Sequence, residues 1–160
     1  MTYKTLIQVS ELRALMSAGT PYMVFDCTFD LSNPSTGENL YHQVHIPGAI
    51  FADLDKNLSA KHGSPGADGK MLFANDADKP ASGGRHPLPN LERFSTWLSE
   101  IGFANDMQAV VYDRNGANYC GRLWWMLKWA GHDAVAVLDG GLQAWQAEGN
   151  DVESGDAVSH

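Results

Sequence analysis

The stretch that decides the fold is AVVYDRNGANYCGRLWWMLKWAGHDAVAVLDGGLQAW, residues 109–145. It opens with a continuous apolar run, 109–112, and contains a second such run at 134–138. Uninterrupted apolar runs are typical of parallel strands that are covered by helices on both faces. A helix that ends at a glycine is predicted after each run, over 119–130 and over 142–148. The stretch therefore predicts two parallel strands, each followed by a helix.

The same alternation extends toward the N-terminus. Short apolar runs at 6–9, 22–25 and 50–52 indicate three further strands, and a helix is predicted over 11–18. Another helix is predicted over 90–101, because its apolar residues recur on one helical face. Strand and helix alternate about five times. This predicts an α/β fold with an open sheet of about five mainly parallel strands and helices on both faces.

Two segments interrupt this alternation, and a third follows it. Residues 32–37 (SNPSTG) are rich in turn-forming residues, and 53–90 contain nine glycines and prolines. A loop as long as 53–90 is uncommon in a compact domain, so it is either a functional segment or a tolerated surface excursion. We expect one domain over 1–149. Residues 150–160 lack apolar periodicity and are expected to form a tail or the start of an interdomain linker.

Composition excludes several classes of protein. Hydrophobic residues make up 44% and charged residues 19% of the 160 residues, which excludes wholesale disorder. The net charge of −8 and the scattered lysines and arginines argue against a nucleic-acid partner. No apolar run approaches the roughly 18 residues of a membrane span, and the N-terminus lacks signal-peptide features. We therefore expect a cytoplasmic protein with no membrane partner.

The chain has few residues suited to binding a metal. Cys27 and Cys120 are too few for a disulfide framework and form no CxxC motif, so two reduced thiols are expected. His42 and His45 are spaced as HxxH, but Pro47 and Gly48 follow, so the pair does not lie on a continuing helix. No phosphate-loop, nucleophile-elbow or zinc-protease motif is present. We expect neither a metal nor another cofactor.

The loop at 113–118 is the strongest candidate site. A strand followed by a short loop and a helix N-terminus makes an anion cradle, because backbone N–H groups and the positive end of the helix converge there. A thiol in this cradle would be activated, but the position holds Asp113. Its carboxylate either fills the cradle with its own charge or caps the loop as a structural residue. Cys120, seven residues farther, is expected to point along the helix rather than into the cradle.

The helix predicted over 119–130 is apolar nearly all round, because Trp124, Trp125 and Trp129 are spread around it. Such a helix must be covered on more than one side. Either this domain buries the whole helix, or the tryptophans form an interface with a partner.

Several motifs resemble those of rhodanese domains. YHQVHIPGA, residues 41–49, is similar to the aromatic-x-x-x-His-Ile-Pro-Gly-Ala signature of that family. The match continues in order through 111–113, 122–127 and 137–145. A Tyr-Asp pair, an arginine nine residues after the aspartate and then Trp-Trp-Met resemble the N-terminal domain of tandem-domain thiosulfate and 3-mercaptopyruvate sulfurtransferases.

The resemblance implies that this chain is not catalytic by itself. In active rhodanese domains a cysteine at the end of the fourth strand carries a persulfide, and here Asp113 stands at that position. In the tandem enzymes the catalytic cysteine belongs to the C-terminal domain, and the active site lies between the two domains. The expected role is to support a second, catalytic rhodanese domain, which moves sulfur from thiosulfate or 3-mercaptopyruvate to cyanide or a thiol.

The resemblance also indicates residues that could face the substrate cleft or the second domain. His45 either approaches the substrate site or bonds a backbone carbonyl. Arg85, in the glycine-rich loop, is a candidate for facing the second domain. Arg122 either faces that domain or pairs with Asp113 or another carboxylate within this one, and we favour the pairing.

Two other functions stay open. The chain could be a free-standing, inactive rhodanese-like module that binds another protein through its loop or its tryptophan helix. It could also be a single-domain sulfurtransferase that uses Cys120 as the nucleophile. Pairing with a separate catalytic domain would distinguish the tandem enzyme from the module, and thiol reactivity near neutral pH would reveal the single-domain enzyme.

Overall fold

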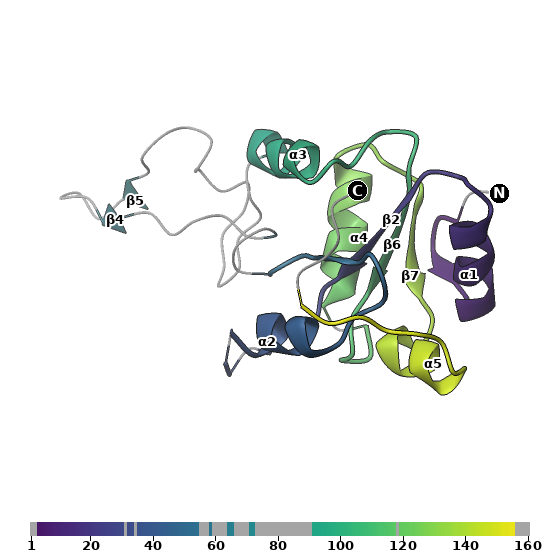
Figure 1. Ribbon diagram of the computed structural model, residues 1–160. Helices are drawn as coiled ribbons and strands as arrows, with labels where there is room; N and C mark the ends of the chain where they lie inside the picture. Colours follow the sequence, from purple (N-terminus) through teal and green to yellow (C-terminus); the bar gives the residue numbers. More distant parts are fainter. Residues whose placement is uncertain are drawn as a thin grey trace.

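A five-stranded parallel sheet forms the centre of the molecule (Figure 1). The computed structural model describes residues 3–30, 32–33, 35–54, 58, 64–65, 71–72, 91–117 and 119–155. In spatial order, the strands of the sheet are β1 (Leu6–Ile7), β7 (Val135–Leu138), β6 (Gln108–Tyr112), β2 (Tyr22–Asp26) and β3 (Ile50–Phe51). Every neighbouring pair is parallel, which confirms the predicted fold class.

Helices cover both faces of this sheet. They are α1 (Val9–Ser17), α2 (Ser35–Gln43), α3 (Leu91–Glu100), α4 (Cys120–Trp129) and α5 (Gly141–Ala147). One hydrophobic cluster joins α3 and α4 to one face, and a second joins α1, α2 and α5 to the other. No helix in the described part of the chain is long and apolar enough to cross a membrane. A separate antiparallel pair, β4 (Ser64–Pro65) and β5 (Met71–Leu72), lies outside the sheet.

The central strands are apolar along their whole length because both of their faces are covered. In β6, Ala109 and Val111 belong to the cluster with α3 and α4, whereas Val110 and Tyr112 belong to the opposite cluster. All four residues are completely buried. This arrangement explains the uninterrupted apolar run from which the strand was predicted.

The turn-rich segment is the clearest departure from the sequence prediction. We expected turns over 32–37, but helix α2 begins at Ser35. Tertiary packing overrides the turn-forming residues here, because Tyr41 on α2 is buried in the second hydrophobic cluster. The helix ends at Gln43, so His45 lies beyond it, as the Pro-Gly sequence predicted.

The chain after α5 stays in contact with the domain. The Trp145 indole N–H donates to the carbonyl oxygen of Asp151 at 2.7 Å, and Glu153 forms an antiparallel β-bridge with His45. We call residues 150–155 the exit segment. The boundary expected at residue 149 stays a prediction.

Two helical glycines provide a matched test of the packing around α2. A Cβ on Gly37 would collide with the backbone carbonyl of Thr28, whereas a Cβ on Gly121 in α4 would meet open space. We expect Gly37→Ala to lower the free energy of unfolding by about 1–3 kcal/mol through overpacking. Gly121→Ala should leave it unchanged or raise it by up to about 1 kcal/mol. Urea denaturation measures both values, and equal effects of the two substitutions would contradict the close packing of α2 on Thr28.

Candidate functional site

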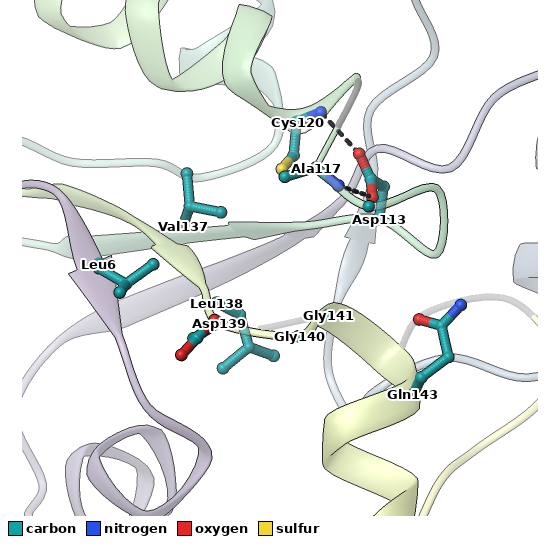
Figure 2. Close-up of a pocket in the computed structure, with 11 residues that line it drawn as sticks. Leu6, Asp113, Ala117, Cys120, Val137, Leu138, Asp139, Gly140, Gly141 and Gln143 are labelled. Atoms are coloured by element: carbon teal, nitrogen blue, oxygen red, sulfur yellow. Dashed lines mark hydrogen bonds between the residues drawn. The ribbon is translucent and has the colours of Figure 1, made fainter.

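The carboxylate of Asp113 occupies the loop between β6 and α4. Its Oδ1 accepts hydrogen bonds from the backbone N–H groups of Asn115 and Ala117, both at 2.9 Å. Its Oδ2 accepts from those of Tyr119 at 2.9 Å and Cys120 at 3.0 Å. The bonds to Ala117 and Cys120 are drawn in Figure 2. Four N–H donors thus converge on one buried carboxylate, which fills the cradle that the sequence predicted for an anion.

The backbone of this loop is bent to aim its N–H groups inward. Gly116 and Ala117 both adopt left-handed conformations, with φ of +69° and +68°. For alanine this conformation costs roughly 1–2 kcal/mol. The charge-assisted bond from the Ala117 N–H to Asp113 offsets that cost, because hydrogen bonds to a carboxylate are stronger than those between neutral groups.

A second loop, after β7, packs against the first. Leu142 donates its N–H to the backbone carbonyl of Asp113 at 3.2 Å, and a Cβ on Gly141 would collide with that same carbonyl. Together the two loops border a cavity of about 320 Å³ at the carboxyl edge of the sheet (Figure 2). Its wall includes Asp113, Cys120, Asp139 and Gln143. This is the edge of a parallel sheet where ligands usually bind.

Cys120 lines this cavity beside Asp113, and its backbone N–H is one of the four donors to the carboxylate. Our expectation that its side chain points along the helix rather than into the cradle stays a prediction. Burial, and then the charge of Asp113, raise the pKa of the Cys120 thiol well above its ordinary value. The pKa of Cys27 is also raised well above its ordinary value, mainly by burial. Both thiols are free and stay protonated near neutral pH.

A buried ion pair lies next to the cradle, and the sequence analysis did not identify it. The Arg114 guanidinium contacts Asp26 at 3.1 Å and donates to the carbonyl oxygen of Val44 at 2.8 Å. It also donates to the Thr28 hydroxyl at 3.0 Å. One signal was available: Asp26 ends β2 and Asp113 follows the adjacent parallel strand β6, so the residue after Asp113 comes close to Asp26.

His45 is completely buried and has partners at both ring nitrogens. Nδ1 lies 2.8 Å from the carbonyl oxygen of Tyr41, and Nε2 lies 3.0 Å from Oε1 of Glu153. The first contact corresponds to the structural alternative that we considered for this residue. His45 does not line the cavity beside Asp113.

Within the described part of the chain, Arg122 forms no ion pair of the kind that we favoured. Its Nε donates to the carbonyl oxygen of Leu58 at 2.9 Å, and its buried Nη2 has no hydrogen-bond partner among the described residues. Asp113 does not pair with it, because that carboxylate is already bound by four backbone N–H groups. Burial lowers the pKa of Arg122. Arg85, the other candidate arginine, lies outside the described residues.

The three tryptophans of α4 have different environments. Trp124 packs against the first hydrophobic cluster and donates its indole N–H to the carbonyl oxygen of Lys4 at 3.1 Å. Trp125 and Trp129 stack on each other, with ring centroids 5.8 Å apart, and belong to neither cluster. The side chain of Trp125 is 46% exposed. The structure thus places Trp124 against this domain and leaves the Trp125–Trp129 pair on the outside of α4.

Together, the parallel sheet and the N–H cradle after its central strand define an α/β domain that is built to hold an anion at the start of a helix. The family model described as "Rhodanese-like domain" matches residues 8–148. The chain therefore belongs to the rhodanese-like domain family.

Among curated proteins, the chain is similar to sulfurtransferases. It is 37% identical to a "Probable 3-mercaptopyruvate sulfurtransferase" of Pseudomonas aeruginosa, covering 98% of this chain and 50% of that protein. It is 30% identical to the human 3-mercaptopyruvate sulfurtransferase, covering 92% of this chain and 44% of that protein. The chain thus spans about half the length of these curated relatives.

Solved structures agree with this relationship. The chain superposes on the 3-mercaptopyruvate sulfurtransferase from Leishmania major with a TM-score of 0.74 and 33% identity, covering 98% of this chain and 38% of that one. For SseA from Escherichia coli, a 3-mercaptopyruvate sulfotransferase, the TM-score is 0.73 and the identity 27%, covering 98% of this chain and 54% of that one.

Two aspartates that follow neighbouring strands provide a test of the cradle. In Asp113→Asn, an amide NH₂ would face two of the N–H donors and leave them unsatisfied, so we expect a loss of about 3 kcal/mol in the free energy of unfolding. Asp139 is exposed and accepts a hydrogen bond from Gln8. Asp139→Asn should therefore change stability by less than about 0.5 kcal/mol. Thermal or urea denaturation would separate the two variants, and an equally mild effect of both would show that the four hydrogen bonds contribute little.

Proposed function

We propose that this chain is the N-terminal, non-catalytic domain of a two-domain sulfurtransferase that uses thiosulfate or 3-mercaptopyruvate as its sulfur donor. In this proposal residues 1–149 complete the substrate cleft and support the catalytic domain. Residues 150–160 lead toward that domain. The whole enzyme transfers sulfur to cyanide or a thiol, with no metal or other cofactor.

The observation that carries the proposal is the occupied cradle. Sulfur transfer needs a thiolate that attacks sulfane sulfur, and N–H donors that hold the resulting persulfide anion. In this chain the four donors are engaged by the Asp113 carboxylate. A carboxylate does not carry sulfane sulfur, and its negative charge repels a second anion. The loop therefore has the architecture of a rhodanese site without its nucleophile.

The state of Cys120 argues against the alternative of a single-domain enzyme. Its thiol is completely buried, and its raised pKa keeps it protonated near neutral pH. A nucleophilic cysteine requires the opposite environment, with partial exposure and a neighbouring positive charge. The lengths of the two curated relatives support a second domain, since each of them is about twice as long as this chain.

A sulfurtransferase assay on this chain alone tests the proposal. With thiosulfate or 3-mercaptopyruvate as donor and cyanide as acceptor, we expect no thiocyanate above background and no persulfide by mass spectrometry. Cys120→Ser and the matched control Cys27→Ser should behave like the parent chain. Turnover that disappears in Cys120→Ser but persists in Cys27→Ser would overturn the proposal in favour of the single-domain enzyme.

The outer face of α4 has the features of an interface with the catalytic domain. Arg122, Trp125 and Trp129 recur at i, i+3 and i+7, which places them on one face of the helix. This face combines a stacked aromatic pair, of which Trp125 is exposed, with the partly buried side chain of Arg122. Aromatic residues and arginine are enriched at protein interfaces. We propose that this face contacts the catalytic domain, and the same features would serve the alternative of a free-standing binding module.

Pairing with a separately produced domain distinguishes these two functions. The probe is the half of the Pseudomonas aeruginosa relative that this chain does not match. We expect measurable pairing by calorimetry, and at least a tenfold weaker affinity for the double variant Trp125→Ala, Trp129→Ala, as is usual for interface aromatics. Leu91→Ala, which truncates an exposed apolar residue of α3, is the control and should pair normally. Absence of pairing, together with affinity for an unrelated protein, would favour the module.

A further inference from the structure

Asn115 and Gly116 form the only Asn-Gly pair in the sequence. The pair lies in the loop between β6 and α4, where Asn115 is partly exposed and Gly116 is exposed. Asparagine is a chemically labile residue. Its side-chain amide carbon can be attacked by the backbone nitrogen of the next residue, and glycine has no Cβ to obstruct that approach. The residue types and their order therefore point to a reactive site within this loop.

The backbone nitrogen of Gly116 is free to react. The cradle takes N–H donors from Asn115 and Ala117, on either side of Gly116, and does not use the N–H of Gly116 itself. Among the described residues, no group accepts a hydrogen bond from this N–H. Because Gly116 is exposed, solvent reaches the nitrogen and can remove its proton. The attacking group is therefore neither hydrogen-bonded nor shielded.

The side-chain amide of Asn115 has a contact that favours this attack. Its Oδ1 accepts the backbone N–H of Phe29 at 3.5 Å. Attack on the amide carbon places negative charge on Oδ1, and an N–H donor directed at that oxygen stabilises the charge. The contact is long in the resting protein, and hydrogen bonds shorten and strengthen when the acceptor becomes charged. Within the described part of the chain, the amide nitrogen that would leave has no hydrogen-bond partner.

We propose that Asn115 is a site of spontaneous deamidation. The Gly116 nitrogen loses its proton and forms a bond to Cγ of Asn115, and the side-chain nitrogen leaves as ammonia, which produces a cyclic imide. Water then opens the imide at either of its carbonyl groups. The products are aspartate, or isoaspartate with the main chain running through the former side chain. The reaction consumes water, releases ammonia and needs neither an oxidant nor a reductant.

Both products alter the loop that surrounds Asp113. Isoaspartate adds a methylene to the main chain directly before Gly116 and so displaces Ala117, whose N–H bonds the Asp113 carboxylate. Aspartate places a second negative charge two residues from Asp113. Deamidation therefore weakens the cradle as the protein ages. This inference does not depend on the proposed function, because the reaction takes place within this chain and needs no substrate.

Peptide mapping of the whole chain tests the inference. The folded protein is kept in neutral buffer at physiological temperature, and mass spectrometry follows the conversion of each asparagine to an acid. Asn105 is the internal reference, since it is exposed but is followed by Asp106 rather than by glycine. We expect Asn115 to convert about tenfold faster or more, which corresponds to a barrier lower by about 1.4 kcal/mol. Fragmentation that distinguishes isoaspartate from aspartate should find both products.

Two glycines provide a matched pair of variants. Gly116 and Gly102 both have left-handed backbones, with φ of +69° and +85°, and a Cβ on either would meet open space. Gly116→Ala places a methyl group beside the attacking nitrogen, so we expect it to slow the conversion of Asn115 by about tenfold or more. Gly102→Ala imposes the same backbone strain elsewhere and should leave that rate unchanged.

Each readout can overturn the inference. Conversion of Asn115 no faster than that of Asn105 would show that the loop holds the amide away from the Gly116 nitrogen. An unchanged rate in Gly116→Ala would show that this nitrogen is not the attacking group. The wild-type map remains decisive even if Gly116→Ala folds poorly, and its result is independent of the sulfurtransferase assay.

Discussion

Four backbone N–H groups that point at one buried carboxylate are the constraint on which the site depends. Hydrogen bonds to Asp113 fix the loop after β6, allow Ala117 its left-handed conformation and set the first turn of α4. The backbone carbonyl of the same residue receives the N–H of Leu142, which ties the following strand-to-helix turn to this loop. A single residue therefore organises the carboxyl edge of the sheet, because its own carboxylate occupies the place that a bound anion would take.

A buried ion pair forms a second set of polar contacts at this loop. The Asp26–Arg114 pair joins the ends of two adjacent strands to the segment before His45, through the Val44 carbonyl. Breaking such a buried pair by removing one partner typically costs about 3–5 kcal/mol, because the remaining charge is left buried. The pair supports the geometry of the edge without facing the cavity, since neither residue lines it.

Much of this architecture could be predicted from the sequence, because its signals are local. The apolar runs identified β6 and β7, and the strand–loop–helix pattern placed Asp113 in an anion cradle. Contacts between distant residues could not be predicted in this way. The bond between His45 and Glu153 spans 108 positions, and no local pattern marks it. For Arg122 we favoured pairing with a carboxylate over facing the second domain. Asp113 is instead bound by backbone donors, and Arg122 donates to the carbonyl oxygen of Leu58. Helix α2 was missed because turn-forming residues are compatible with a helix that tertiary packing stabilises.

The lengths of the strands have a consequence for the behaviour of the protein at high concentration. The two strands at the borders of the sheet, β1 and β3, each pair over two residues, whereas β2 and β6, with five residues each, lie inside. A border strand exposes a row of unpaired backbone groups on which another chain can add a strand, and a short one presents a poor template. The apolar strands that would be most prone to amyloid-like stacking are thus enclosed by their neighbours. A sheet this rich in valine can therefore exist in a small domain without offering a long edge for self-association.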